Sequence, residues 1–216
     1  MGLFSRRPRT RAELVAAADR ARARGRVRKA VAAYREALEA DPGDPAVNVK
    51  LGPLLARLGD AEGGARCFRT AAKRHLEAGF TDRAAAVNAA AAGVFPLDAA
   101  FRLELARLNV LRGRRQDAVQ ALLDGGRAQA RARRPEAAAA LLARALDLEP
   151  WHLDAGVALV PLLAQAGRAE DARRLLDGLL AGPGEAFQVA LEEADGGGEV
   201  APWVHRPLLR KRGPAE

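Results

Sequence analysis

The chain has 216 residues, a formal net charge of +8 and one cysteine. A single cysteine excludes a disulfide framework and a cysteine-based zinc site, and it suits a reducing, cytoplasmic setting. No apolar run approaches the roughly 18 residues that span a bilayer, and the basic start lacks the apolar core of a signal peptide. We therefore expect a cytoplasmic protein without a transmembrane segment.

The arginine-rich composition has a plain explanation. Only four of the 35 cationic residues are lysines, and alanine and glycine are abundant. This bias is typical of a GC-rich bacterial genome, so the basic charge alone is weak evidence for nucleic-acid binding. Only 4% of the residues are aromatic. A core must therefore be built from alanine, leucine and valine, which suits closely packed helices.

After a basic lead over residues 1–10, glycines and prolines divide the chain into helical segments. The breaks are short, so consecutive helices are expected to be antiparallel neighbours. Thr81 or Asp82 is expected to cap the fifth helix, and the Gly125-Gly126 pair is expected to weaken or bend the seventh. The predicted helices lie at about 11–24, 27–40, 45–58, 61–78, 82–95, 99–112, 115–133, 135–149, 153–166 and 169–181.

Beyond residue 181 the sequence predicts two further segments. A short helix within 182–195 is expected to cap the apolar end of the helix stack. Residues 196–216 follow a run of three glycines and are predicted to form a flexible, disordered tail. Two interpretations of that tail stay open, a solvated end or a segment that docks on the helices. Its large apolar residues are Trp203, Leu208 and Leu209.

The helices repeat with a period of 54 residues. A small residue, a larger one four positions later and a small one three positions after that share one helix face, and a proline then ends the helix. The copies are Ala30, Tyr34, Ala37 and Pro42; Ala84, Asn88, Ala91 and Pro96; and Ala138, Leu142, Ala145 and Pro150. A second set with the same period is Leu51, Leu105 and Leu159; Gly59, Gly113 and Gly167; and Phe68, Leu122 and Leu176. Three helices therefore make one repeating unit.

These positions resemble the tetratricopeptide repeat (TPR) superfamily, whose 34-residue unit pairs two helices. The clearest copy is Leu51-Gly52, Gly59-Asp60, Gly64, Phe68 and Ala71, and the resemblance covers residues 11–181. It implies an all-α, right-handed helical-repeat solenoid of about ten antiparallel helices in a single repeat domain. Counting 34 residues back from Pro96 makes the fourth helix part of two repeats, and the seventh has the same double role. A regular concave groove is therefore not expected.

TPR-like proteins bind peptides or partner proteins on the face lined by the first helix of each repeat. Carried over to this chain, the implied positions are mostly apolar, and the clamp that some members use for a C-terminal carboxylate is missing. The resemblance therefore implies a non-enzymatic scaffold that binds an apolar or helical segment of a protein partner, or the chain's own tail. Prolines inside two of these helices are expected to kink them. The partner-binding positions are Val49, Pro53, Leu103, Arg107, Val157 and Pro161.

A second hypothesis is a binder of nucleic acid or of an anionic membrane surface. It depends on six basic residues that alternate along the sequence, and on one helix these would spread around both sides without forming a stripe. Solvated surface is therefore the preferred interpretation of this run. The six residues are Arg20, Arg22, Arg24, Arg26, Arg28 and Lys29.

No catalytic or metal site is expected. His75, His152 and His205 are scattered, and none has a second ligand at helical spacing. Cys67 is interpreted as a small core residue because no base lies near it in the sequence. The sequence thus predicts no cofactor and no enzyme activity.

Overall fold

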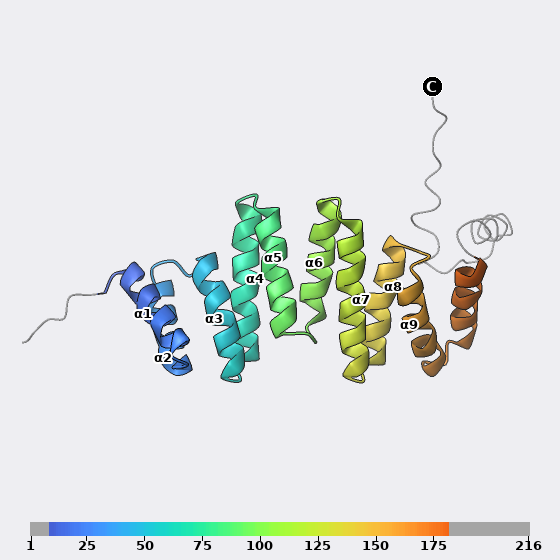
Figure 1. The fold of residues 1–216 in the computed structure, drawn as a ribbon, viewed down its shortest axis with the longest axis horizontal. Coiled ribbons are helices and arrows are strands. Elements are labelled where there is room, and N and C mark those ends of the chain that lie inside the picture. Colours follow the sequence, from blue (N-terminus) through green and yellow to red (C-terminus); the bar gives the residue numbers. More distant parts are fainter. Residues whose placement is uncertain (1–8, 182–216) are drawn as a thin grey trace, which may run out of the picture. The chain divides into compact units, whose positions relative to one another are not determined.

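The structure, a computed structural model, describes residues 9–181. Residues 1–8, the expected capping segment 182–195 and the expected tail 196–216 lie outside the description. All regular structure in 9–181 is α-helical (Figure 1). The helices are α1 (Arg11–Ala23), α2 (Val27–Leu38), α3 (Pro45–Arg57), α4 (Ala61–Glu77), α5 (Thr81–Val94), α6 (Ala99–Leu111), α7 (Arg115–Arg131), α8 (Pro135–Leu148), α9 (Leu153–Gln165) and a last helix over 169–181.

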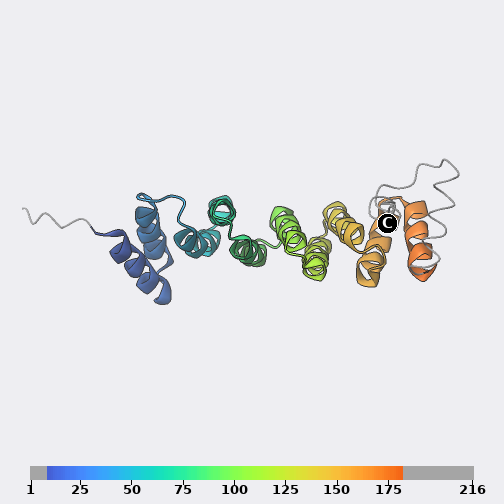
Figure 2. The same cartoon turned by 90° about the horizontal axis from the view of Figure 1, so that it is seen from above.

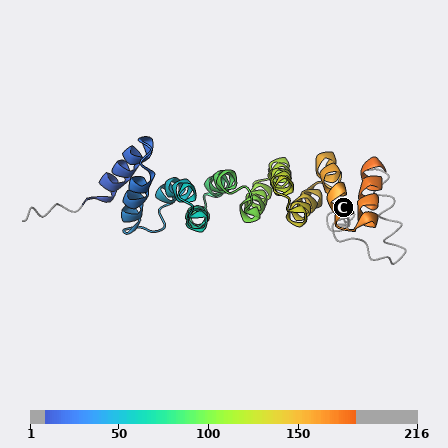
Figure 3. The same ribbon diagram turned by 90° about the horizontal axis from the view of Figure 1, so that it is seen from below.

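The chain divides into two compact units between Phe95 and Pro96. The first unit contains α1 to α5, and the second begins with α6. Within each unit, helices that follow one another in sequence pack together, and in the first unit α3 also contacts α5. In the second unit α6 contacts α8, and α7 contacts α9, so the helices alternate between two rows (Figures 2 and 3).

Glycine ends half of the described helices, as the sequence predicts. Five glycines that follow a helix have positive φ, a conformation that costs an L-residue about 1 kcal/mol or more. They are Gly25, Gly59, Gly79, Gly113 and Gly167. Arg133, with φ 57°, occupies the same kind of position after α7. Apart from Arg133, the described turns obey the simple rule that a left-handed residue is a glycine.

Aspartates begin several helices. The side chains of Asp44, Asp60 and Asp98 each accept a hydrogen bond from a backbone N–H in the first turn of α3, α4 and α6. The expectation for α5 was wrong, because Phe80 precedes the helix and provides no side-chain cap. The Phe80 N–H donates a hydrogen bond to the His75 carbonyl and completes the turn at Gly79. Thr81 is therefore the first residue of α5 and not the residue before it.

Each unit has a core of small and aliphatic side chains. In the first unit Tyr34 and Leu51 pack with the buried Cys67, which confirms that the cysteine is a core residue. Burial raises the pKa of its thiol, so the reactive thiolate is disfavoured. In the second unit the core is built around Leu122, Leu142 and other residues of α6 to α9. Burial of this apolar surface is the main source of stability for such helices.

Close approach of helix backbones depends on glycine at a few points. A Cβ on Gly52 would lie 2.7 Å from Cε2 of Phe68, whose ring meets Phe95 edge to face. The Gly125-Gly126 pair lies inside α7, as the predicted helix bounds place it. Both glycines are buried, and a Cβ on Gly126 would lie 2.7 Å from Cγ of Leu142. The intrinsic cost of glycine in a helix is therefore offset by the packing of α8 against α7.

Two features are absent from residues 9–181. None of the described helices is long and apolar enough to cross a membrane. Within the same residues, no group of three or more histidine, cysteine, aspartate or glutamate side chains is arranged to hold a metal ion.

Candidate functional site

The six predicted partner-binding positions lie on α3, α6 and α9. Val49 and Pro53 on α3 are half-buried, whereas Leu103, Arg107, Val157 and Pro161 are exposed. The α3 positions belong to the first unit and the others to the second. Within the second unit, α6 shares a row with α8, and α9 shares a row with α7. The predicted positions of α3, α6 and α9 therefore do not form one continuous binding surface within a unit.

Prolines lie inside both α3 and α9. Pro53 and Pro161 have no N–H, so neither can donate the usual helical hydrogen bond to the residue four positions earlier. Those residues are Val49 and Val157, two of the other predicted positions. Each carbonyl therefore lacks its normal helical donor.

A carboxylate beside the α3 positions joins three helices. Asp19 of α1 accepts a hydrogen bond from the Tyr34 hydroxyl at 2.5 Å and one from the Lys50 ammonium at 2.9 Å. The bond from Tyr34 is the largest cause that lowers the pKa of Asp19. Burial, followed by the hydrogen bond and charge of Asp19, raises the pKa of Tyr34 to about 12. Both shifts favour a neutral phenol beside an ionised carboxylate, so the group is a structural link and not an acid–base pair.

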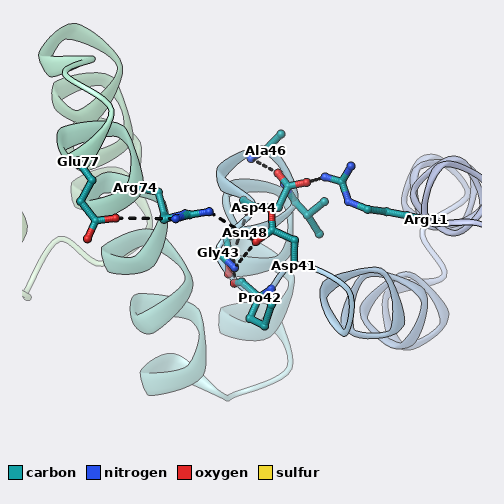
Figure 4. A network of polar contacts seen from close by, with 10 residues as sticks. Arg11, Asp41, Pro42, Gly43, Asp44, Ala46, Asn48, Arg74 and Glu77 are labelled. Atoms are coloured by element: carbon teal, nitrogen blue, oxygen red, sulfur yellow. Dashed lines mark hydrogen bonds and ion pairs between the residues drawn. The ribbon is translucent and has the colours of Figure 1, made fainter.

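A second polar network holds the loop between α2 and α3 (Figure 4). Asp44 is buried, caps α3 through the Ala46 and Val47 N–H groups, and forms an ion pair with Arg11 of α1. The Asn48 amide donates to the Pro42 carbonyl at 2.9 Å. Arg74 of α4 lies 3.8 Å from Asp41 and 4.0 Å from Glu77. These partners are internal, so the network serves to position the helices.

On α6 the charge of Arg107 is already matched. Its guanidinium donates to both carboxylate oxygens of Glu104, at 2.8 and 2.6 Å. The hydrogen bonding raises the pKa of Arg107, so the residue stays protonated. Leu103 is exposed beside this pair, and the α6 positions therefore form a mixed polar and apolar surface.

On α9 four exposed apolar residues follow one another along the helix, and the polar Asp154 and Gln165 are exposed beside them. Leu153 and Val157 are 62% and 64% exposed, and Pro161 and Ala164 are exposed further along. Residues three or four apart on a helix share a face, so these four form one stripe, which we call the α9 stripe. The other side of α9 is buried in the core through Ala155, Gly156, Leu159 and Leu163. The stripe is thus an apolar surface on a firmly packed helix.

A groove between α8 and α9, which we call the α8–α9 groove, was not predicted from the sequence. It has a volume of about 380 Å³, and most of its lining is apolar. Alanines of α8 form one wall, and Leu159, Leu162 and Leu163 of α9 form the other, with Glu136 and Arg168 among the polar residues at its border. The sequence marks these alanines only as helix formers. The groove depends on how far apart α8 and α9 pack.

A shallow pocket of about 820 Å³ lies at the loop between α8 and α9. Trp151 and Leu153 line it together with Arg115, whose Nε donates to the Leu148 carbonyl at 2.7 Å. His152 caps α9, because its Nδ1 accepts from the Ala155 N–H. Leu153 belongs to both this pocket and the α9 stripe, so the two surfaces are continuous.

The six basic residues of the second hypothesis are gathered at one place. Gly25 ends α1 and reverses the chain, so residues 20–29 form the turn and the adjoining helix ends of the α1–α2 hairpin. All six side chains are exposed. The six basic residues were expected to spread around one helix. They instead form a cluster at the tip of a hairpin.

The antiparallel helix pairs of both units, with glycine turns and a 54-residue period, define a helical-repeat protein. Three family models, each described as tetratricopeptide repeat, match residues 11–54, 69–125 and 129–188. The chain belongs to the tetratricopeptide repeat superfamily. The second match begins inside α4 and ends inside α7, and the third begins inside α7, as expected for long helices shared between two repeats.

Several solved structures are similar to this chain at low sequence identity. The crystal structure of MamA protein is 16% identical and covers 89% of this chain and 98% of its own, with a TM-score of 0.30. BtubC from P. vanneervenii is 20% identical over 88% of this chain and 83% of its own, with a TM-score of 0.39. A thermophilic TPR protein from Thermus thermophilus is 20% identical over 72% of this chain and 100% of its own, with a TM-score of 0.27. No curated protein matches the sequence.

Membership of the superfamily indicates the general role. Tetratricopeptide repeats are protein-interaction modules and are generally not enzymes, so this chain is a protein-interaction scaffold. The predicted docking residues Trp203, Leu208 and Leu209 lie outside the described residues.

Proposed function

We propose that this scaffold binds an apolar, helical segment of a partner protein along the α9 stripe. The observation that carries the proposal is the exposure of Leu153 and Val157, at 62% and 64%, on a helix whose opposite side is packed in the core. An amphipathic partner helix with apolar residues at positions i, i+3, i+4 and i+7 matches such a surface.

Two features of the α9 stripe suit a helix. Each leucine or valine that becomes fully buried contributes about 1.5–3 kcal/mol before the cost of association. The Val157 carbonyl lacks its helical donor because of Pro161, so it can accept a hydrogen bond from a polar partner side chain.

A peptide selection tests the proposal. The full chain is immobilised, and peptides from a random display library are selected against it. We expect the enriched peptides to share apolar residues at helical spacing. Val157→Asp should weaken their binding about tenfold or more, because it places a charge in the apolar contact. Leu111→Asp is the matched control, since Leu111 is similarly exposed at 66% but lies at the end of α6.

Two outcomes would overturn the proposal. One is an enriched set without helical apolar spacing, and the other is an equal loss of binding in Val157→Asp and Leu111→Asp. A chain that ends at Gly196 serves as a further arm. Tighter peptide binding by the shortened chain would support docking of the tail on the same surface, and unchanged binding would support a solvated tail.

A further inference from the structure

The tip of the α1–α2 hairpin carries a second surface that the α9 stripe does not involve. We call it the basic tip and define it by Arg20, Arg22, Arg24, Arg26, Arg28 and Lys29. Its backbone is held by two hydrogen bonds of 2.9 Å, from the Gly25 N–H to the Arg22 carbonyl and from the Arg26 N–H to the Ala21 carbonyl. All six side chains therefore project from this turn or from the adjoining ends of α1 and α2.

The charge of the basic tip is hardly compensated within the protein. Arg22 lies 3.8 Å from Asp19, but that carboxylate already accepts hydrogen bonds from Tyr34 and Lys50. Among the described residues, the other five members of the tip have no ion pair. The first turn of α2 contains no acidic residue that would offset them. Cationic side chains on one turn repel one another. An anionic partner would relieve this repulsion, and each of the cations would contribute to its binding.

Several arginines elsewhere in the described chain contrast with this pattern. Arg11 pairs with Asp44, Arg127 lies 2.8 Å from Asp154, and Arg168 lies 2.6 Å from Asp171. Carboxylates are thus the partners of many arginines in this protein. At the basic tip, in contrast, several cations without an ion pair follow one another around a single turn.

The chemistry of the tip narrows the class of its partner. Five of the six cations are arginines, whose planar guanidinium groups bind carboxylates in a bidentate way. Tyr34 is the aromatic residue of this hairpin, and it is fully buried, so no ring is available on which nucleic-acid bases can stack. Neither α1 nor α2 exposes a large apolar side chain that would insert into a membrane. The protein is also an interaction scaffold, and this class favours a protein partner over nucleic acid or a membrane.

We propose that the basic tip binds an acidic segment of a partner protein, rich in aspartate and glutamate. This contact is separate from the helix-binding surface of the second unit and goes beyond it. It would give the scaffold two chemically different contacts, one apolar and one electrostatic.

Fluorescence anisotropy of the full chain with a labelled peptide of alternating aspartate and glutamate tests this proposal. The variant R24E/R26E/R28E should weaken binding about tenfold or more. The control R57E/R66E/R174E changes the net charge equally at exposed arginines without an ion pair in the described structure, and it should have a much smaller effect. The variant R24K/R26K/R28K keeps the charge but removes the guanidinium forks, so an intermediate loss is expected. Circular dichroism checks that each variant is folded.

Several results would overturn the proposal. Equal losses in the tip variant and the control would show that only overall charge matters. Tighter, tip-dependent binding of a single-stranded oligonucleotide or of vesicles containing phosphatidylserine would assign the tip to nucleic acid or to membrane instead. Failure here leaves the α9 surface unaffected, because Val157→Asp and the tip variants change different units of the chain.

Discussion

The hydroxyl of Tyr34 donates a 2.5 Å hydrogen bond to Oδ1 of Asp19, and this pair joins α2 to α1. Lys50 of α3 donates to the other oxygen of the same carboxylate. One buried ring and one carboxylate therefore connect the first three helices. The residues that replace Tyr34 one and two periods later are Asn88 and Leu142, so this link is specific to the first copy.

Tyr34→Phe should lower the free energy of unfolding by about 1.5 kcal/mol at neutral pH, the usual contribution of a hydrogen bond to a charged group. The difference from wild type should shrink in alkali. The pKa of Tyr34 is raised to about 12 in the folded protein, so its contribution is complete below the ordinary value of 10.0 and is lost as the pH rises from there through 12. Urea unfolding at several pH values measures this. A difference that widens above pH 10 would contradict the assignment.

In acid, the contribution of the Asp19–Tyr34 pair to stability is lost as the pH falls. The pKa of Asp19 is lowered from its ordinary value of 3.8, so its contribution is present above that value. It is lost as the pH falls through the lowered pKa. Asp19→Asn should therefore flatten the acid limb of the stability curve, measured by thermal unfolding between neutral and acidic pH. An unchanged acid limb would count against the link.

Gly52→Ala should destabilise the first unit by about 1–3 kcal/mol, because the new methyl group would lie 2.7 Å from Cε2 of Phe68 and 3.1 Å from the Gly64 carbonyl oxygen. Gly93→Ala is a matched control in α5. A methyl group at Gly93 meets no atom within 4 Å, so this change should stabilise the helix by up to about 1 kcal/mol. Chemical denaturation of both variants gives the comparison. Equal effects would mean that Phe68 moves aside.

Arg133→Gly should raise stability by about 0.5–1 kcal/mol, since Arg133 has φ 57° where the preceding copies have Gly25 and Gly79. The reverse change, Gly79→Arg, should cost about 1–2 kcal/mol because Gly79 has φ 77°. The midpoints of thermal unfolding report both effects. If Arg133→Gly were destabilising, the arginine side chain would have to stabilise the turn by more than its backbone strain.

Pro161→Ala should stabilise α9 by up to about 3 kcal/mol, because alanine restores the N–H that bonds to the Val157 carbonyl. The α6 helix has Arg107 at this position and shows that the repeat accepts a residue with an N–H there. Hydrogen exchange of the α9 amides measures the change. Unaltered protection would indicate that the helix already compensates for the proline.

Much of the helical pattern could be predicted because its causes are local. Gly25 and Gly113 end helices through their own backbone freedom, and Asp44 and Asp98 begin them by bonding to N–H groups two or three residues away. The cap of α5 was predicted wrongly because the turn at Gly79 makes Phe80, and not Thr81 or Asp82, the residue before the helix. Gly125-Gly126 lies inside α7 as predicted, and Leu141 and Leu142 fill the space that its missing side chains leave.

The candidate site was predicted only in part. Val157 and Pro161 could be placed on one helix face from spacing alone, because i and i+4 share a face in any helix. Their exposure depends on which side of α9 the core covers, and the α8–α9 groove depends on where α8 lies. No local rule specifies either. The basic tip was missed because the six charges were considered on one helix, although a break between the helices at 11–24 and 27–40 was predicted.

The sequence by itself determined the positions of the helices, the 54-residue period and the membership of the superfamily, because these follow from backbone preferences and residue types within a few positions. The tertiary structure decided which apolar residues stay exposed on α9, how the α8–α9 groove opens, and that Asp19, Tyr34 and Lys50 meet. Those features require side chains from different helices to come together. Their distances depend on how the whole core packs, and a linear pattern does not contain that information.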